Sequence, residues 1–282
     1  MNPLSRNRSL AFAVFSLAAP LFAAAQAPAA PAALLGSTFY NPGTLTATPT
    51  KSGSRTDVYD GPTSMFNRLS IHITTLNPGL AVHPPQSHQQ EEAVLVKEGS
   101  LQVSLNGKLL NAGPGALLFL APHAVHNLTN VGDKPASYYV IDVYTDATAT
   151  VPDQPYDELA PPGKLHSTVI DCDHLPSKPT KNGSRTDVAD SPTATFVEFE
   201  SHMTTLNPGR NNGYLTDPAD EVIVVKSGLV ESKINGVACR LGPGSFFFQA
   251  ANDPHTMTNL GTTPTTYQIF KFVTDKQPKH SS

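Results

Sequence analysis

The chain contains one sequence unit twice. Residues 51–79 and 181–209 are identical at most positions, including the runs GSRTDV and TTLNPG, at an offset of 130 residues. After Gly79 and Gly209 the offset becomes 129, and it aligns EEAVLVKEG with DEVIVVKSG and HNLTN with HTMTN. Such repetition indicates one structural unit present in two copies. We predict a first unit over residues 37–149, a linker at 150–164, a second unit over 165–275 and a tail at 276–282.

Each unit has the pattern of an all-β fold. Leu101, Val103 and Leu105 alternate with polar residues, as expected of a strand with one buried face. Asn106-Gly107 and Asn235-Gly236 each stand between two such runs, which is a strong hairpin signal. The chain also holds 26 prolines and 19 glycines, which suit many short strands joined by turns. We therefore predict a β-sandwich or β-barrel for each repeat.

The N-terminus has the features of a secretory signal peptide. Arg6 and Arg8 precede an apolar stretch at 10–25, which ends in three small alanines. We predict a signal peptide over residues 1–25, a flexible Ala/Pro-rich lead-in at 26–36, and a secreted or periplasmic protein. The alternative is a buried N-terminal helix. Since no second stretch is long and apolar enough to span a bilayer, we expect no membrane association after cleavage.

The net charge limits the classes of partner that the chain can bind, and the two cysteines limit its disulfide content. The net charge is −4, and loss of Arg6 and Arg8 makes it −6. This balance gives no footprint for nucleic acid or anionic lipid as a partner. Cys172 and Cys239 allow one disulfide in an oxidising compartment, or two small buried thiols, and both alternatives stay open.

The stretch HPPQSHQQEEAVLVKEG at 83–99 holds the first candidates for a metal site. On a regular strand Gln86 and His88 would face the same side, and Glu92 has the same parity. His126 follows on a later strand. Imidazole and carboxylate ligands that converge from separate strands suit a divalent transition metal, which can be Mn, Fe, Ni, Cu or Zn.

These residues resemble the two motifs of the cupin superfamily. The first motif reads roughly G-x5-H-x-H-x3,4-E-x6-G, and Gly99 lies seven residues after Glu92 as it requires. The second reads roughly G-x5-P-x-G-x2-H-x3-N, and His126 with Asn130 fits it. The resemblance covers both repeats. It implies a bicupin: two tandem cupin-type jelly-roll β-barrels that arose by internal duplication.

The resemblance also implies which residues bind metal. In the family, two histidines and the glutamate of the first motif, with the histidine of the second, hold a divalent metal. Carried over, these are Gln86, His88, Glu92 and His126. Gln86 departs from the pattern, because it replaces a histidine. Its amide oxygen is a weaker donor toward late transition metals, which favours a harder ion such as Mn²⁺.

The second repeat keeps less of this set. At the offset of 129 its equivalents are Leu215, Asp217, Glu221 and His255. Asp217, Glu221 and His255 predict a second metal site for a hard cation, and a metal-free barrel with a hydrogen-bonded Glu–His pair accounts for the same residues.

Four other histidines are predicted to lie outside the metal site. His83 and His123 have the wrong parity for ligands and are expected at an exposed rim. His123 stands where the family motif has glycine. His72 and His202 lie on the polar face of a strand, which favours a surface or interface role.

Three functional hypotheses follow. The first is a metal-dependent enzyme of cupin type that acts on a small organic molecule in the first barrel; within the family it resembles dioxygenases of phenolic or diketone substrates. The chain also resembles the bicupin ureidoglycine aminohydrolase. That enzyme acts inside cells, so the predicted signal peptide argues against the same activity here. The second is a non-catalytic small-molecule or sugar-binding cupin with an eroded metal site. The third is a structural or partner-binding protein. Because such barrels often associate, a homodimer is one hypothesis; the alternative is that the two repeats pack against each other and mimic that dimer within one chain.

Overall fold

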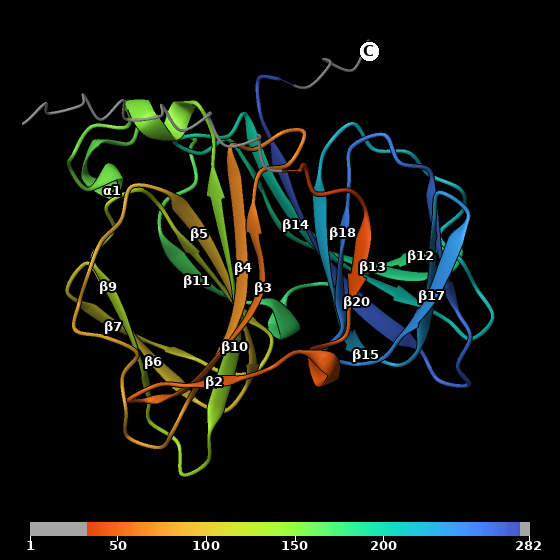
Figure 1. The fold of residues 1–282 in the computed structure, drawn as a ribbon, viewed down its shortest axis with the longest axis horizontal. Coiled ribbons are helices and arrows are strands. Elements are labelled where there is room, and N and C mark those ends of the chain that lie inside the picture. Colours follow the sequence, from red (N-terminus) through yellow and green to blue (C-terminus); the bar gives the residue numbers. More distant parts are fainter. Residues whose placement is uncertain (1–32, 277–282) are drawn as a thin grey trace, which may run out of the picture. The chain divides into compact units, whose positions relative to one another are not determined.

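The computed structural model describes residues 33–276, and the predicted signal peptide lies outside the described residues. Within this range no helix is long and apolar enough to cross a membrane. The fold is all-β, as predicted (Figure 1): each repeat pairs a seven-stranded antiparallel sheet with a three-stranded one. The helices are short: η1 (Pro42–Thr44), η2 (Ala147–Thr150), α1 (Tyr156–Leu159) and η3 (Cys172–His174).

The first repeat contributes nine strands to its own two sheets. They are β2 (Thr48–Pro49), β3 (Gly53–Gly61), β4 (Arg68–Leu76), β5 (Glu91–Glu98), β6 (Leu101–Leu105), β7 (Lys108–Ala112), β8 (Ala116–Leu120), β9 (His126–Asn130) and β10 (Ala136–Tyr144). The large sheet has the order β11-β8-β5-β10-β4-β3-β2 and the small sheet β7-β6-β9. One apolar core joins the two sheets, because Val94 and Leu118 of the large sheet pack with Val103 and Leu128 of the small one.

The second repeat follows the same plan. Its strands are β12 (Lys178–Thr180), β13 (Gly183–Ser191), β14 (Glu198–Leu206), β15 (Glu221–Ser227), β16 (Val230–Ile234), β17 (Val237–Leu241), β18 (Phe246–Gln249), β19 (His255–Asn259) and β20 (Thr265–Val273). Its sheets have the orders β1-β18-β15-β20-β14-β13-β12 and β17-β16-β19.

The predicted hairpins are present. Asn106 and Gly107 have φ of 48° and 79°, and Asn235 and Gly236 have φ of 50° and 82°. Two successive positive φ values are typical of the type I′ turns that match the twist of paired strands. These turns connect β6 to β7 and β16 to β17. The cysteines do not pair: Cys172 is buried, Cys239 is partly exposed, and both are free.

The two repeats exchange their first strands. β1 (Thr38–Tyr40) pairs with β18 of the second repeat, and β11 (Thr168–Asp171) pairs with β8 of the first. Each large sheet therefore ends in a strand that comes from the other repeat. This exchange gives the β8 edge of one large sheet and the β18 edge of the other a hydrogen-bonded partner.

A continuous core joins the repeats. Phe119 of β8 packs against Phe199 of β14, with ring centroids 5.1 Å apart. Matching hydrogen bonds cross this interface in both directions. Thr193 donates to the buried Glu91 carboxylate at 2.9 Å, and Thr63 donates to Asp220 at 2.7 Å. The interface therefore repeats the internal symmetry of the sequence.

Candidate metal centre

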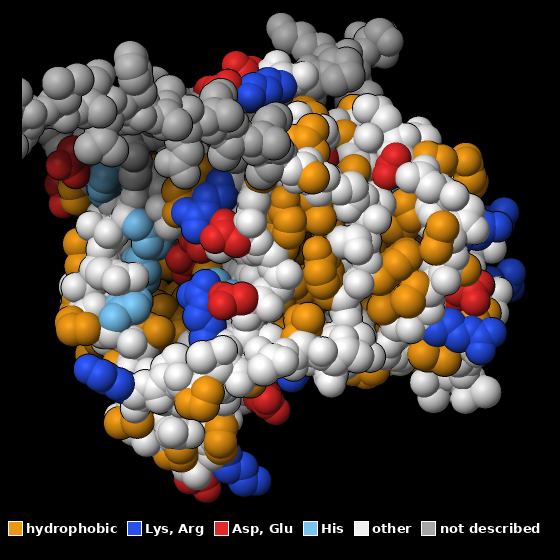
Figure 2. All heavy atoms as spheres, viewed as in Figure 1, with side chains coloured by type: hydrophobic (Ala, Val, Ile, Leu, Met, Phe, Trp, Pro, Cys, Tyr) orange, Lys and Arg blue, Asp and Glu red, His pale blue; other side chains and the backbone are white. Residues whose placement is uncertain are grey.

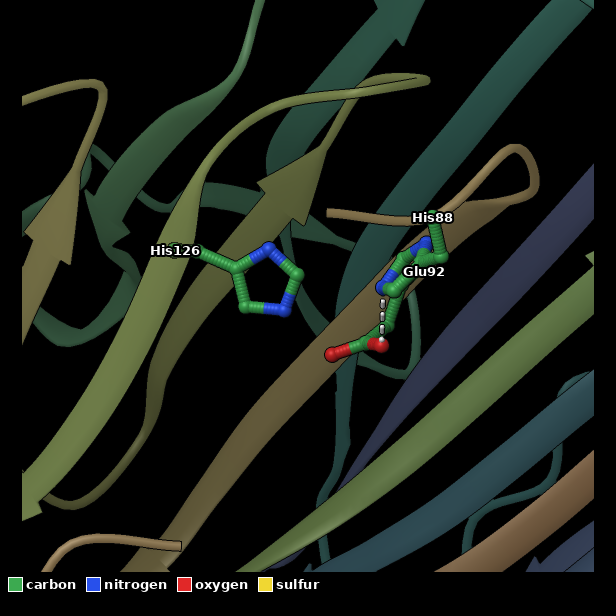
Figure 3. A group of neighbouring side chains, drawn as sticks. All are labelled: His88, Glu92 and His126. Carbon is green, nitrogen blue, oxygen red and sulfur yellow. Dashed lines mark hydrogen bonds and ion pairs between the residues drawn. The ribbon is translucent and has the colours of Figure 1, made fainter. Parts of the chain in front are cut away.

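Three of the predicted ligands meet inside the first barrel. Glu92 is the second residue of β5, His126 is the first residue of β9, and His88 lies in the loop before β5. One potential ligand atom from each lies within 4.8 Å of the others. His88 Nε2 is 3.0 Å from Glu92 Oε2, and His126 points toward this pair from the facing strand (Figure 3). Two imidazoles and a carboxylate in this arrangement fit the donor set of a divalent transition metal.

Backbone carbonyls orient both imidazoles. The Nδ1–H of His88 donates to the carbonyl of Gln90 at 3.0 Å, and that of His126 donates to the carbonyl of Ala124 at 2.9 Å. Each bond fixes the ring and leaves Nε2 as the nitrogen that can bind a metal. The chain thus positions its ligands before any ion binds.

The loop around Gln86 differs from the sequence prediction. Residues 82–90 do not form a regular strand, so the parity argument does not apply to Gln86 and His88. Instead Gln86 forms an isolated antiparallel bridge, in which its backbone N–H and carbonyl both bond to His126. Gln86 still borders the cavity. Whether its amide oxygen binds the metal stays a prediction.

His123 helps to hold this loop. Its φ is +59°, so a histidine adopts the left-handed conformation at the position where the family motif has glycine. Its backbone N–H donates to the carbonyl of His88 at 2.8 Å. The equivalent Asn252 has φ of +65° and bonds to the carbonyl of Asp217. The turn geometry therefore survives the loss of glycine in both repeats.

The candidate ligands open into a cavity of about 260 Å³. Figure 2 shows histidine side chains gathered on this side of the first repeat, next to basic and acidic groups. The lining side chains other than the candidate ligands include Arg55, His72, His83, Gln90, Tyr138 and Asp142. His83 lies closer to the site than its predicted rim position implied, with its ring centroid 6.0 Å from that of His126.

Asp142 is a site residue that the motifs did not reveal. It lies on β10 directly opposite Glu92 in the strand register, and Gln90 Nε2 donates to its carboxylate at 3.1 Å. Burial, followed by repulsion from Glu92, raises the pKa of Asp142 to about 7. Two carboxylates buried this close need a cation or a proton between them. This pairing is a second reason why the site suits a divalent metal.

The ionisation of the histidines follows from their surroundings. Burial lowers the pKa of His88, but its hydrogen bond and attraction to Glu92 outweigh burial and raise it overall. Burial lowers the pKa of His126, so this ring is held neutral. Since a metal needs an unprotonated nitrogen, metal binding must displace the proton that His88 shares with Glu92.

His72 and His202 are not surface residues, so that interpretation was wrong. Their exposed fractions are 8% and 7%, and they line the cavities of the first and second barrels. Burial lowers the pKa of His72 to about 4. The alternation rule failed because β4 and β14 lie inside their sheets, with the nominally polar face turned into the barrel.

The second barrel has its own cavity, of about 310 Å³, which Asp217, Glu221 and His255 line. The ammonium of Lys271 stands among these residues, 2.6 Å from Asp217 Oδ2 and 3.4 Å from Glu221 Oε1. Over residues 33–276 His88, Glu92 and His126 form the only group of histidine, cysteine and acidic residues with metal-binding spacing. The second metal site stays a prediction.

A model of the cupin domain matches the chain twice, over residues 72–143 and 202–270. The two matches cover half of the sequence, and each falls in one repeat. The chain therefore belongs to the cupin family and has the bicupin architecture that the motifs implied. No curated protein sequence matches it.

Solved structures share this fold at low sequence identity. A deletion mutant of oxalate decarboxylase from Bacillus subtilis is 14% identical, with a TM-score of 0.63 over 86% of this chain and 79% of that one. YlbA from E. coli is 12% identical, with a TM-score of 0.66 over 86% and 94%. AerE from Microcystis aeruginosa is 11% identical, with a TM-score of 0.61 over 81% and 98%. These similarities establish the fold.

Proposed function

We propose that the protein is a secreted or periplasmic bicupin enzyme whose first barrel uses a divalent metal to act on a small organic molecule. The observation that carries this proposal is the convergence of His88, Glu92 and His126 at a cavity. At about 260 Å³ the cavity is slightly smaller than the roughly 300–1,000 Å³ typical of ligand pockets. A substrate of few heavy atoms suits it best.

Among the candidate metals we propose manganese first, ahead of Fe, Ni, Cu and Zn. Carboxylate and amide oxygens are hard donors, and Glu92 and Gln86 supply them beside two imidazoles. The Mn(II) centres of the B. subtilis oxalate decarboxylase, which shares the fold, support this choice. When bound, the metal would supply a Lewis acid or a means of activating O₂.

The chain itself would orient the substrate. Arg55 lines the cavity and is held by a 2.6 Å hydrogen bond from its Nε to Asp57, so a cationic group faces the bound molecule. Tyr138 and Val140 add a partly apolar wall. This combination favours a small molecule with a negative or strongly polar group next to an apolar part.

Metal analysis tests the proposal. Protein purified from its native compartment should contain close to one equivalent of a transition metal, and His88→Ala or His126→Ala should remove it. His83→Ala is the matched control, since His83 lies beside the same cavity, and it should retain the metal. Metal below about a tenth of an equivalent in the wild-type protein would refute the proposal, because such an enzyme is inactive without its ion.

A non-catalytic binding protein is the second candidate. The cavity of the second barrel favours it, because Lys271 already neutralises the acidic side chains there. Turnover distinguishes the two candidates. A metal-loaded enzyme that is given a small phenol, diketone or carboxylate consumes O₂ or releases a product. A binding protein given the same compounds shows only a shift of its melting temperature.

The compartment is tested separately. Cell fractionation should place the protein outside the cytoplasm, with a mature N-terminus at Gln26. A homodimer is a further proposal, which sedimentation analysis tests directly.

A further inference from the structure

Lys271 of the second barrel stands at the position that an acidic residue occupies in the first barrel. At the offset of 129 residues, Lys271 is equivalent to Asp142. Both stand opposite the site glutamate in the strand register: Asp142 opposite Glu92, and Lys271 opposite Glu221. The two barrels therefore hold an acidic and a basic residue at the same place.

The ammonium of Lys271 is bound by three carboxylates. Its Nζ lies 2.6 Å from Asp217 Oδ2, 3.2 Å from Glu200 Oε2 and 3.4 Å from Glu221 Oε1. The side chain is 15% exposed, so water screens these contacts little. Burial disfavours the charge, but attraction to Glu221 and Asp217 outweighs burial and raises the pKa of Lys271. The ammonium of Lys271 therefore stands among the residues that would bind a metal.

Glu221 has a second internal partner. Gln249 Nε2 donates to its Oε2 at 2.8 Å, while Lys271 faces its Oε1. In the first barrel the equivalent of Gln249 is Leu120, which offers no hydrogen bond. Both oxygens of Glu221 are thus satisfied by the chain, whereas Glu92 bonds to His88 and has the acidic residue Asp142 opposite it in the register.

We propose that the Lys271 ammonium is the resident cation of the second barrel, and that it excludes a divalent metal from Asp217, Glu221 and His255. The predicted second metal site is then a latent one. A metal ion would have to displace an ammonium held by three carboxylates, and Leu215 offers no donor in return. The proposal concerns the second barrel alone and does not rest on activity in the first.

The full chain with His88→Ala and His126→Ala isolates the second barrel. This background removes both imidazoles of the first site, so we expect that site to bind no Mn²⁺. We expect less than about a tenth of an equivalent by equilibrium dialysis with elemental analysis. One equivalent of Mn²⁺ in this background would overturn the proposal, whether or not the first barrel is an enzyme.

Lys271→Asp in the same background should open the latent site, because it restores the acidic residue of the first barrel. We expect Mn²⁺ to bind at least about tenfold more tightly than to the background and to raise the melting temperature. Lys226→Asp is the matched control: Lys226 is similarly shielded, at 17% exposure, and its Nζ is paired with Asp173 outside this cavity. The control should gain no binding.

A fourth carboxylate can prevent folding, so Lys271→Met provides a second test. It removes the ammonium without adding charge, and Mn²⁺ should again bind about tenfold more tightly and stabilise the variant. If folded Lys271→Met and Lys271→Asp both bind Mn²⁺ no better than the background, the proposal is wrong. If the proposed function is wrong, the wild-type protein contains no metal. The comparisons above are made among variants of the double-alanine background, so they do not depend on the metal content of the wild type.

Discussion

Gln86 is the residue that best tests the donor set of the first barrel. Its backbone bonds to His126 in both directions, so its position is fixed whatever its side chain. Gln86→His should therefore place a third imidazole at the cavity. Because imidazole favours late transition metals, we expect Zn²⁺ and Ni²⁺ affinity to rise about tenfold or more, with a smaller change for Mn²⁺. Competition titrations measure this selectivity.

Gln89→His is the control for this experiment. Gln89 lies three residues further along the same loop and is exposed. It should leave the relative affinities unchanged. Unchanged affinities for both Mn²⁺ and Zn²⁺ in Gln86→His would show that residue 86 does not contact the metal.

His72 should make the metal-free protein sensitive to acid. Burial lowers its pKa from 6.5 to about 4 in the folded chain. The neutral ring thus contributes stability that is complete above about pH 6.5 and is lost as the pH falls through about 4. At 1.36 kcal/mol per pKa unit, the loss has an upper bound of about 3 kcal/mol.

Urea unfolding at pH 7 and pH 4, in the presence of a chelator, tests this expectation. His72→Gln should lose less unfolding free energy between the two pH values than the wild type. His174→Gln is the control, because His174 has an 85% exposed side chain. Parallel pH profiles for His72→Gln and the wild type would contradict the assignment.

The sequence predicted the central ligands but not the ionisable residues that stand opposite the two glutamates. His88, Glu92 and His126 carry a spacing that can be recognised, and the structure brings them together. Asp142 and Lys271 lie in β10 and β20 without any motif, and only the strand register sets them opposite the glutamates. One signal was available in the sequence: at the offset of 129 residues, Asp142 of the first repeat aligns with Lys271 of the second.

At the level of the secondary-structure elements, glycine fixes where β5 turns into β6. Gly99 has φ of +88°, and a Cβ there would meet Cα and Cβ of Ala136 at 2.5 Å. Gly99→Ala should therefore lower the free energy of unfolding for two reasons. The left-handed backbone costs about 1–2 kcal/mol, and overpacking against Ala136 costs about 1–3 kcal/mol. Gly107→Ala is the matched control, because Gly107 has φ of +79° and no atom within 4 Å of an added Cβ.

Chemical denaturation of both variants separates the two effects. Both should be destabilised, and Gly99→Ala should be less stable than Gly107→Ala by the overpacking alone. Equal losses would mean that the β5–β6 turn can move away from β10.

The strands and hairpins were predictable because alternation and Asn-Gly turns are local signals. The irregular loop at 82–90 was not, because its shape depends on bonds to His126 and His123.

The whole molecule is held together by features that no local signal reveals. The exchange of β1 and β11 joins segments far apart in the sequence, so neither alternation nor turn residues could predict it. Because each large sheet is completed by the other repeat, and because one core crosses the interface, we expect the barrels to depend on each other for stability. We therefore expect the duplicated sequence to unfold as one cooperative unit rather than as two independent ones.

This mutual dependence predicts that damage in the second barrel weakens the first. Leu241 is 2% exposed and belongs to a core cluster formed by residues of the second barrel with Phe39 of β1. Leu241→Ala should cost about 2–5 kcal/mol. We expect calorimetry to show one transition at a lower temperature, with metal release from the first barrel shifted by the same amount. Leu109→Ala, at a 66% exposed position, should shift neither. Two separate transitions, with metal released at the wild-type temperature, would show that the barrels unfold independently despite the exchanged strands.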